Sequence, residues 1–455
     1  MPVSPARAAA FDILLRVERE SSYASELLHS ASYENLSHSD HALTTELVMG
    51  VLRWRSRLDE EIAGASSQPL VKLDIEILIA LRLALYQFRW LTRVPERAAL
   101  HESVELVKRA RKRSAAPFVN AVLRKLSAKP SENRNVSDDQ NSSPEILAAA
   151  FSHPVWLIER WVQEFGPDAT RQICQYDQSV PSTTIRLRTP EAASELAAEG
   201  ISLSPGEFLS SARRVEAGDI TATQAFRQGR VVIQDEGSQL VAALLGRGDQ
   251  GEGDCILDCC AAPGGKTLAI ADRNPGSVVT AVEVHSHRAR LMKKLLPSTS
   301  TMPSAQIRVV VGDARHLPVS QTYNRILADV PCSGTGTLSR NPEIKWRLTH
   351  NDVQELRERQ LGILRSALNH LAPGGRLVYS TCSLEREENE AVVETILAEN
   401  KSFRLVHCAA EMDRLRVAGE LLPQHVPSLT REPYLHTIPG IHPCDGFFAA
   451  IIERA

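Results

Sequence analysis

Two cysteines follow short apolar segments and are surrounded by small polar or turn-forming residues. Cys332 lies in Asp329-Val-Pro-Cys-Ser-Gly-Thr-Gly336, and Cys382 lies in Ser380-Thr-Cys-Ser383. An isolated cysteine is commonly a small buried hydrophobic residue, but polar surroundings favour a reactive thiol. Because a thiolate is a strong nucleophile, two thiols with an acid nearby predict covalent catalysis.

This pair of thiols suits chemistry on a pyrimidine ring. Carbon 5 of cytosine attacks a methyl sulfonium only after a nucleophile has added to carbon 6, and a base must later remove the carbon 5 proton. An amino-group methyltransferase would carry Asp/Asn-Pro-Pro-Tyr/Phe after its fourth strand, where this chain has Asp329-Val-Pro-Cys332. The cysteine in place of the aromatic residue favours methylation of carbon over nitrogen.

A segment of small residues follows the first predicted strand of the C-terminal part. It reads Asp258-Cys-Cys-Ala-Ala-Pro-Gly-Gly-Lys266 and leads into an apolar helix start at Thr267. Small residues let the backbone approach a ligand at a helix N-terminus. The segment matches neither G-x-G-x-x-G nor G-x-x-x-x-G-K-[ST], which argues against a nicotinamide dehydrogenase and a P-loop ATPase.

Carboxylates also follow three successive predicted strands: Glu283, Asp313 and Asp329. A single acid at such a place is usually a turn or cap residue. In a doubly wound sheet, however, ligands bind at the carboxyl ends of the strands, so we expect the three acids to converge on one crevice. There Glu283 could accept hydrogen bonds from ribose hydroxyls, and Asp313 could meet an adenine amino group.

The apolar periodicity divides the chain into four segments. Residues 1–127 have helical spacing, with Ile75–Phe88 apolar nearly all round, and predict an all-helical domain with a central buried helix. Residues 128–144 are polar and predict a flexible linker. Residues 145–230 suggest a small α+β module, in which a helical pattern around Val155–Phe165 gives way to short mixed segments such as Ser182–Leu187.

Residues 231–455 alternate β-branched runs with helical patterns and predict an α/β domain built on a parallel sheet. A helix is expected from Asp352 to Leu371, stopped by Pro373-Gly374-Gly375. The strands are expected at Cys255–Asp258, Val278–Val284, Arg308–Val311, Arg325–Asp329 and Arg376–Ser380.

Composition narrows the class of protein. The 455 residues are 43% hydrophobic and 24% charged, which is typical of a globular protein, and no segment has the pattern of a signal peptide or a membrane span. The eight cysteines form no C-x-x-C pair, which argues against a zinc ribbon or a disulfide scaffold and favours a reducing, cytoplasmic location.

The formal charge of −3 provides no general attraction for nucleic acid. RNA binding would therefore depend on a local basic surface at the end of the helical domain, or that surface is simply a solvated face. Its residues are Lys108, Arg109, Arg111, Lys112, Arg113, Arg124 and Lys125. Trp346 could likewise stack on RNA or lie in the core.

Taken together, the motifs resemble bacterial 16S ribosomal RNA cytosine-5 methyltransferases of the RsmB (Sun/Fmu) type. They are DCCAAPGGKT, VEVH, GDA, ADVPCSGTGTLSRNPEIKW, STCSLEREENE and DGFFAAIIER, and residues from about Ala6 to Leu126 look like a NusB-type RNA-binding domain. The resemblance implies a NusB-like helical domain, an α+β RNA-binding module and a Rossmann-like methyltransferase domain. It also implies S-adenosylmethionine as cofactor, small-subunit ribosomal RNA as partner, no metal and a monomeric chain.

The same resemblance implies roles for individual residues. Cys382 would be the nucleophile, Cys332 would assist product release, and Asp329 with Lys266 would also touch the target base. The predicted cofactor-binding residues are Cys260, Ala261, Ala262, Pro263, Gly264, Gly265, Lys266, Glu283, Asp313 and Asp329.

Two alternatives remain open from the sequence. The catalytic motifs are shared with transfer RNA cytosine-5 methyltransferases, so the RNA class is not fixed by them. A fold can also lose its activity, which would leave an RNA-binding assembly factor. The presence of both Cys332 and Cys382 argues against that second alternative.

Overall fold

The computed structural model describes residues 3–20, 22–33, 35–128, 143–247, 254–296, 305–422 and 428–455. Most of the linker predicted at 128–144 lies outside the described residues. The chain forms two compact units, one made of residues 1–180 and 338–347 and the other of 181–337 and 348–455. These units do not follow the four predicted segments one to one, so the boundaries of those segments stay a prediction.

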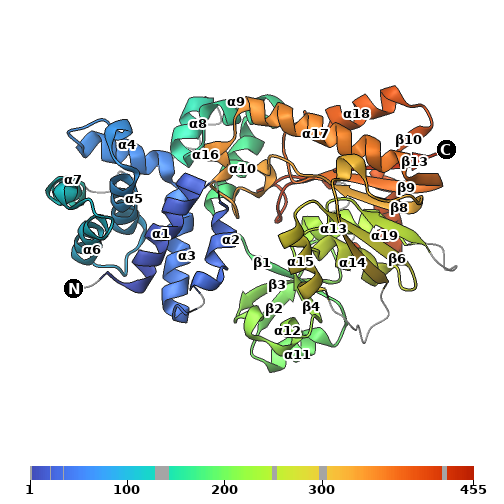
Figure 1. The fold of residues 1–455 in the computed structure, drawn as a ribbon, viewed down its shortest axis with the longest axis horizontal. Coiled ribbons are helices and arrows are strands. Elements are labelled where there is room, and N and C mark those ends of the chain that lie inside the picture. Colours follow the sequence, from blue (N-terminus) through green and yellow to red (C-terminus); the bar gives the residue numbers. More distant parts are fainter. Residues whose placement is uncertain are drawn as a thin grey trace. The chain divides into compact units, whose positions relative to one another are not determined.

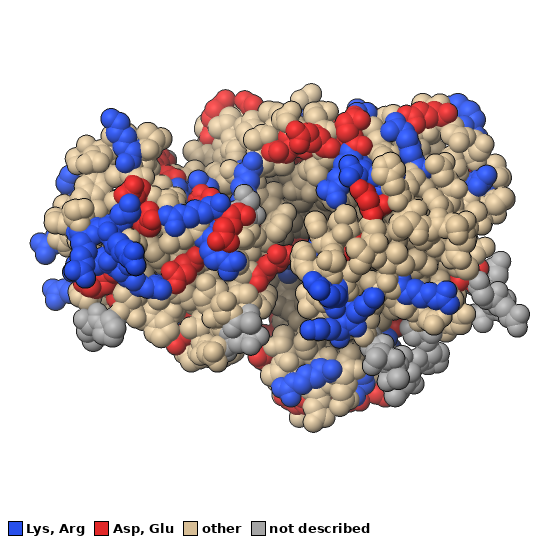
Figure 2. Space-filling model, viewed as in Figure 1, with Lys and Arg blue, Asp and Glu red and all other residues tan. Residues whose placement is uncertain are grey.

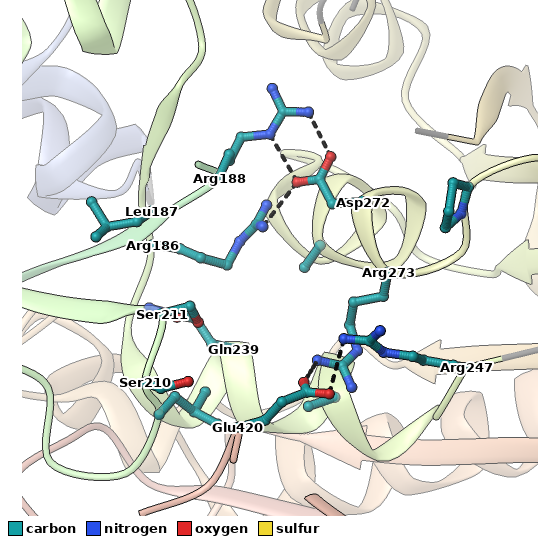
Figure 3. A pocket seen from close by; sticks show the side chains of 14 residues that line it. Arg186, Leu187, Arg188, Ser210, Ser211, Gln239, Arg247, Asp272, Arg273 and Glu420 are labelled. Carbon is teal, nitrogen blue, oxygen red and sulfur yellow. Dashed lines mark hydrogen bonds and ion pairs between the residues drawn. The ribbon is translucent and has the colours of Figure 1, made fainter. Parts of the chain in front are cut away.

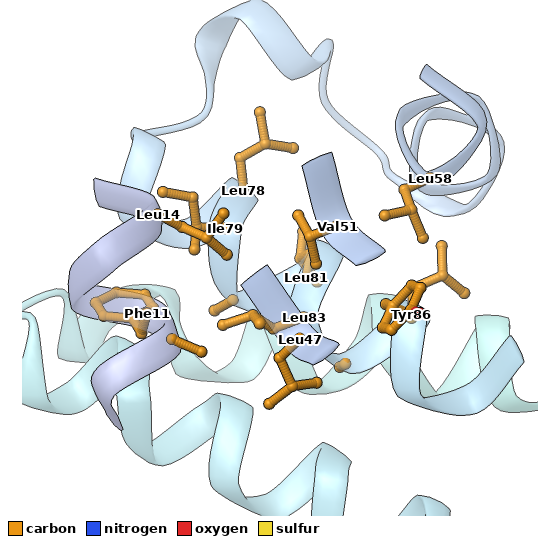
Figure 4. Close-up of a cluster of buried hydrophobic side chains, with 14 of the residues drawn as sticks. Phe11, Leu14, Leu47, Val51, Leu58, Leu78, Ile79, Leu81, Leu83 and Tyr86 are labelled. Carbon is orange, nitrogen blue, oxygen red and sulfur yellow. The ribbon is translucent and has the colours of Figure 1, made fainter. Parts of the chain in front are cut away.

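The first unit is helical throughout its described residues, as predicted (Figure 1). Eleven consecutive residues of α5, from Ile77 to Gln87, are buried, which confirms the predicted central helix. Figure 4 shows side chains of the surrounding helices packed against it. The helices are α1 Pro5–Glu20, α2 Ala24–Leu28, α3 His38–Arg53, α4 Arg55–Ala65, α5 Ile75–Trp90, α6 Glu96–Arg109, α7 Ala116–Ser127, α8 Pro144–Phe151, α9 Val155–Phe165, α10 Pro167–Gln178 and α16 Ile344–Arg347.

The segment 338–347 joins this unit although its neighbours in the sequence belong to the other one. Trp346 is half-buried and donates its indole N–H to the carbonyl oxygen of Leu52 at 2.6 Å, which favours the core interpretation over RNA stacking. Lys345 is buried, and its Nζ donates to the carbonyl oxygen of Arg53 at 3.2 Å. Burial lowers the pKa of Lys345 to about 7, although the nearby Asp177 opposes that shift.

Replacing Lys345 with methionine is expected to stabilise the helical unit at neutral pH. Between pH 7 and 10.5 the unfolded chain binds more protons at Lys345 than the folded chain, so this residue makes stability rise with pH by up to about 1.4 kcal/mol per unit. The gain of Lys345→Met over the parent should therefore shrink between pH 7.5 and pH 9.5. Thermal unfolding followed by circular dichroism measures the stability of each variant at the two pH values. Lys72→Met, at an exposed lysine, is the matched control. Equal responses of the two variants would contradict this account.

The second unit contains two sheets and their helices. A four-stranded antiparallel sheet has the order β2-β3-β1-β4, with β1 at Thr183–Leu187, β2 at Ser202–Pro205, β3 at Ala212–Ala217 and β4 at Val231–Ile233. Helices α11 Ala192–Ala198 and α12 Gln224–Arg227 accompany it. Together with the helices of residues 144–178, this confirms the predicted α+β character of the middle region.

The larger sheet has the order β11-β12-β13-β9-β8-β5-β6-β7, with β10 paired to β13. Helices α13, α14 and α19 contribute to one apolar cluster against it, and α17 and α18 contribute to another, so both faces are covered (Figure 1). The strands are β5 Cys255–Asp258, β6 Val278–Glu283, β7 Gln306–Val311, β8 Tyr323–Asp329, β9 Leu371–Thr381, β10 Phe403–Val406, β11 Thr430–Arg431, β12 Tyr434–Thr437 and β13 Phe447–Arg454. The helices are α13 Glu236–Leu244, α14 Gly265–Arg273, α15 Ser286–Leu295, α17 His350–Asn369, α18 Glu390–Glu399 and α19 Cys408–Val417.

The structure corrects two details of the predicted α/β domain. Only β7, β6, β5, β8 and β9 are parallel, because β13 pairs antiparallel with β9 and extends the sheet with antiparallel strands. Helix α17 ends at Asn369, and Leu371 begins β9, which includes the Pro373-Gly374-Gly375 turn signal. No helix within the described residues is long and apolar enough to cross a membrane.

Candidate active site

The predicted site residues come from one edge of the larger sheet. Strands β6, β5, β8 and β9 lie side by side and run parallel, and they end at Glu283, Asp258, Asp329 and Thr381, one residue before Cys382. Asp313 follows the adjacent β7 by two residues. The carboxyl ends of neighbouring parallel strands form the ligand crevice of such folds, so the topology gathers these side chains at one crevice.

The two cysteines lie in contact. Their sulfur atoms are 3.2 Å apart, and the backbone N–H of Cys382 donates to Sγ of Cys332 at 3.3 Å. The hydrogen bond to Cys382 and burial together raise the pKa of Cys332 well above its ordinary value. Cys332 is therefore a protonated thiol at neutral pH and can donate its hydrogen to the sulfur of Cys382.

Lys266 and Asp329 form an ion pair beside these sulfurs. Nζ of Lys266 lies 2.7 Å from Oδ2 of Asp329, and the hydroxyl of Ser380 donates to Oδ1 at 2.8 Å. Burial lowers the pKa of Lys266, but the attraction and hydrogen bond of Asp329 outweigh it and leave that pKa raised, with a smaller contribution from Cys382. The site thus holds a lysine cation close enough to act electrostatically on Cys382. The cation also lies 5.0 Å from the centre of the Phe447 ring.

The small residues from Cys260 to Gly265 connect β5 to α14. Gly264 is the N-cap of α14 with a φ of 112°, a conformation that glycine adopts without strain, and no side chain caps the helix. The first N–H groups of α14 are therefore not occupied by a capping side chain, which suits an anionic ligand group. Burial raises the pKa of Cys260, so its thiol is not the candidate nucleophile.

The two outer acids differ in their surroundings. Glu283 is buried, and its Oε1 accepts the backbone N–H of His285 at 2.8 Å, while its other oxygen has no partner among the described residues. Asp313 instead accepts four hydrogen bonds from the backbone and guanidinium of Arg315, which lower its pKa to about 2. Glu283 can accept a ligand hydroxyl directly, whereas Asp313 is already bound to an exposed arginine.

Glu388 joins the two cysteine loops, a role that the sequence motifs did not indicate. One carboxylate oxygen accepts the backbone N–H of Ser333 at 2.9 Å and the amide of Gln360 at 2.8 Å. The other oxygen accepts the hydroxyls of Ser333 and Ser383, the residues that follow Cys332 and Cys382. Glu388 is completely buried, and burial raises its pKa. Its position in the STCSLEREENE motif, among other acids, was the only signal available in the sequence.

The backbones of the same loops also lie in close contact. The N–H of Gly336 donates to the carbonyl of Cys382 at 2.9 Å, and the N–H of Gly446 donates to the carbonyl of Gly336 at 2.7 Å. A Cβ atom on Gly336 would lie 2.3 Å from the carbonyl oxygen of Gly446. Only glycine therefore allows this approach of the Cys332 loop to the start of β13.

Replacing Glu388 with alanine is expected to lower kcat more than it changes the KM for cofactor, because Glu388 positions the sulfurs without touching them. Leaving several buried donors without an acceptor should also cost about 3 kcal/mol of unfolding free energy. Glu388→Gln keeps one acceptor oxygen and should recover part of both losses. Steady-state kinetics and denaturant unfolding measure these effects, with exposed Glu358→Gln as control. A full loss of cofactor affinity with kcat preserved would contradict the positioning role.

Comparison with known proteins finds three family models that match successive parts of the chain. Residues 4–128 match the NusB family, residues 153–220 match the ferredoxin-like domain of RsmF/B-like methyltransferases, and residues 248–453 match the 16S rRNA methyltransferase RsmB/F model. The probable ribosomal RNA small subunit methyltransferase B of Bacillus subtilis is 34% identical over 465 aligned residues and covers 100% of both chains. The chain belongs to the RsmB/F family of 16S rRNA methyltransferases.

Two further relatives agree with this family. The ribosomal RNA small subunit methyltransferase B of Vibrio cholerae is 31% identical to this RsmB/F-family chain, covering 98% of it and 97% of the relative. A solved structure of a methyltransferase homologue from Pyrococcus horikoshii has a TM-score of 0.56 at 24% identity, covering 69% of this chain and 99% of that one, and it shows the fold. The predicted fold class, with a NusB-like N-terminal domain and a Rossmann-like methyltransferase domain, is confirmed.

S-adenosylmethionine is the methyl donor of this RsmB/F-family methyltransferase, and the residues present fit it. The buried Glu283 keeps one carboxylate oxygen without a partner among the described residues, which suits ribose hydroxyls. The first turn of α14 has no side-chain cap, which suits a carboxylate. Within the described residues, no group of three or more His, Cys, Asp or Glu side chains could hold a metal ion.

Proposed function

We propose that this enzyme methylates carbon 5 of a specific cytidine in 16S ribosomal RNA through a covalent adduct between Cys382 and carbon 6. The observation that carries the proposal is the 3.2 Å contact between Cys332 and Cys382, beside the ion pair of Lys266 and Asp329. A methyltransferase acting on an amino nitrogen or a ribose oxygen has no use for a thiol pair. Methylation of carbon 5 requires one thiol as the nucleophile, because this carbon becomes nucleophilic only after addition at carbon 6, and a second thiol can assist release of the product.

Cys382, Lys266 and Cys332 would each have a separate role in the reaction. The sulfur of Cys382 forms a bond to carbon 6, while the Lys266 cation and the thiol hydrogen of Cys332 stabilise the thiolate before attack. S-adenosylmethionine supplies the methyl group, which carbon 5 takes from the sulfonium. Water in the crevice then acts as the base and carries the carbon 5 proton to solvent, the C5–C6 double bond re-forms, and the electron pair of the C6–S bond returns to the sulfur of Cys382. Cys332 assists that release by donating a hydrogen bond to the departing sulfur.

For the cofactor, we assign Cys260, Ala261, Ala262, Pro263, Gly264, Gly265, Lys266, Glu283, Asp313 and Asp329 as the binding residues. Glu283 would accept from the ribose hydroxyls through its free oxygen. Asp313 would accept from the adenine amino group once Arg315, which is exposed, moves aside. Asp329 and Lys266 would also touch the target base, since their ion pair lies close enough to Cys382 for the two groups to interact electrostatically.

The helical unit offers a surface for the RNA. Lys and Arg side chains gather over α6 (Figure 2). Lys108, Arg109 and Lys112 are paired with acids, whereas Arg111, Arg113 and Arg124 have no acidic partner within the described residues. Unpaired arginines can contact phosphates without first breaking an ion pair. These arginines are therefore the expected contacts to the phosphates of ribosomal RNA. As the family resemblance implies, we also expect a monomeric, cytoplasmic enzyme that meets this RNA before assembly buries the target.

The experiment that tests the function uses purified enzyme, labelled S-adenosylmethionine and ribosomal RNA lacking the modification. The labelled RNA is digested to nucleosides, which are separated by liquid chromatography and identified by mass spectrometry. The proposal predicts label in 5-methylcytidine from 16S RNA and not from transfer RNA. Label in transfer RNA alone would favour the transfer RNA alternative, and label in another nucleoside would refute the carbon 5 chemistry. No transfer to either RNA would favour the non-catalytic assembly factor.

A further inference from the structure

A cavity of about 360 Å³ lies within the second unit, between the end of β1 and helices α13 and α14 (Figure 3). Figure 3 shows arginine side chains entering it from several elements. Two arginines come from the end of β1, one follows α13, and one ends α14. The charged residues that line the cavity are Arg186, Arg188, Arg247, Arg273, Asp272 and Glu420.

Ion pairs account for only part of this charge. Arg188 makes two hydrogen bonds to Asp272, at 2.8 and 2.5 Å, and Arg186 makes a third at 2.9 Å. Arg247 donates to Glu420 at 3.0 Å, and Arg273 donates to the other oxygen of the same carboxylate. Four guanidinium groups thus face two carboxylates, which leaves two positive charges in the lining.

Several donors of these arginines are also unpartnered. Arg186 is only 8% exposed, and its buried Nη2 has no hydrogen-bond partner among the described residues. The Nε and Nη2 atoms of Arg273 are also buried, and neither has a hydrogen-bond partner among the described residues. A buried donor without an acceptor costs free energy, so a ligand that supplies acceptor oxygens would be stabilised here.

We propose that this cavity, which we call the arginine pocket, binds a phosphate group. A guanidinium presents its donors in a planar fork that matches phosphate oxygens, and the excess positive charge matches a phosphate anion. The volume lies at the small end of ligand sites and accommodates a phosphate with an attached sugar. The phosphate belongs either to the backbone of bound RNA or to a free phosphate compound.

The arginine pocket is separate from the crevice of the cysteines. Lys266 lies in the first turn of α14, whereas Asp272 and Arg273 are its last residues. Across a nine-residue helix this separation is on the order of 10 Å. The inference therefore stands on different residues from the proposed reaction and can fail or hold independently of it.

The test uses Ser210, an exposed residue at the lining of the pocket whose replacement leaves every arginine in place. Ser210→Asp adds a negative charge, and Ser210→Asn adds a side chain of similar size without charge. Titration calorimetry of the full chain with inorganic phosphate, in phosphate-free buffer, should show binding to the parent and to Ser210→Asn. Binding to Ser210→Asp should be about tenfold weaker, as expected for one like charge nearby.

A ten-nucleotide adenosine oligonucleotide distinguishes the two sources of phosphate, because it contains no target cytidine. If the pocket holds the RNA backbone, Ser210→Asp weakens oligonucleotide binding relative to Ser210→Asn, and inorganic phosphate competes with the oligonucleotide. If the pocket holds a free phosphate compound, the two variants bind the oligonucleotide equally and differ only with inorganic phosphate. The proposal would be overturned if the two variants bound both probes with equal affinity. It would also be overturned if the parent bound no inorganic phosphate at a concentration of about 10 mM.

Discussion

Cys382→Ala is expected to abolish methyl transfer while leaving the binding of S-adenosylmethionine unchanged. Without the thiolate, carbon 6 has no nucleophile, and carbon 5 stays too weakly nucleophilic to accept the methyl group. Removal of a covalent nucleophile commonly lowers kcat by about 10⁴-fold or more. The fold should persist, because Cys382 is half-buried and its replacement removes a single sulfur atom next to Cys332.

Single-turnover transfer of labelled methyl groups to unmodified 16S RNA measures this loss. Isothermal titration with S-adenosylmethionine, performed on the same preparation, shows whether the cofactor site is intact. Cys255→Ala is the matched control, because Cys255 is also half-buried and lies at the start of β5, at the opposite end of that strand from the crevice. Retention of more than about one tenth of the parent rate in Cys382→Ala would exclude it as the nucleophile.

Cys332→Ala is expected to have a different defect: methyl transfer proceeds once, and the protein then remains attached to the RNA. The sulfur of Cys332 lies 3.2 Å from that of Cys382, and the raised pKa of Cys332 favours its protonated form, which can donate a hydrogen bond to the departing sulfur. Loss of that donor leaves the departing thiolate without stabilisation, so release becomes the slow step. Charge-assisted hydrogen bonds of this kind are worth about 1.5–3 kcal/mol, which corresponds to a slowing of at least about tenfold.

Denaturing gel electrophoresis of the variant incubated with cofactor and end-labelled RNA should show a slowly migrating protein–RNA band. The band should require S-adenosylmethionine and should disappear in the double variant that also lacks Cys382. Adducts that accumulate in Cys382→Ala and not in Cys332→Ala would reverse the two assignments. Their absence from both variants, under conditions where the parent turns over, would argue against release by Cys332.

Much of the fold was predictable because its signals are local. The apolar residues of α5 are consecutive, and the parallel strands are short β-branched runs, so periodicity located them to within a few residues. The C-terminal β13 was missed because Phe447–Ile452 is a continuous buried apolar run, which periodicity does not separate from a helix. The boundary between α17 and β9 was misplaced because tertiary pairing of Leu371 with β8 outweighs the local turn signal.

Part of the candidate site was predictable because ligands of α/β folds bind at the carboxyl ends of parallel strands. That rule indicated Glu283, Asp329 and the two cysteines, and the topology does bring their strand ends to one edge. Sequence did not reveal the role of Glu388, because its hydrogen bonds join residues about 50 positions apart. The arginine pocket was equally hidden, since its four arginines are spread over residues 186–273 and only the packing of β1 on α14 brings them together.

The central claim is that the sulfur of Cys382 bonds to carbon 6 of the target base, and a trapped adduct tests it most directly. RNA carrying 5-fluorocytidine at the target traps this bond, because fluorine cannot leave carbon 5 as a cation in place of the proton. After tryptic digestion of the complex, mass spectrometry should find the nucleotide on the peptide Leu377–Arg386, which contains Cys382. Attachment to Ile326–Arg340, which contains Cys332, or the absence of any adduct from an active preparation, would contradict the account.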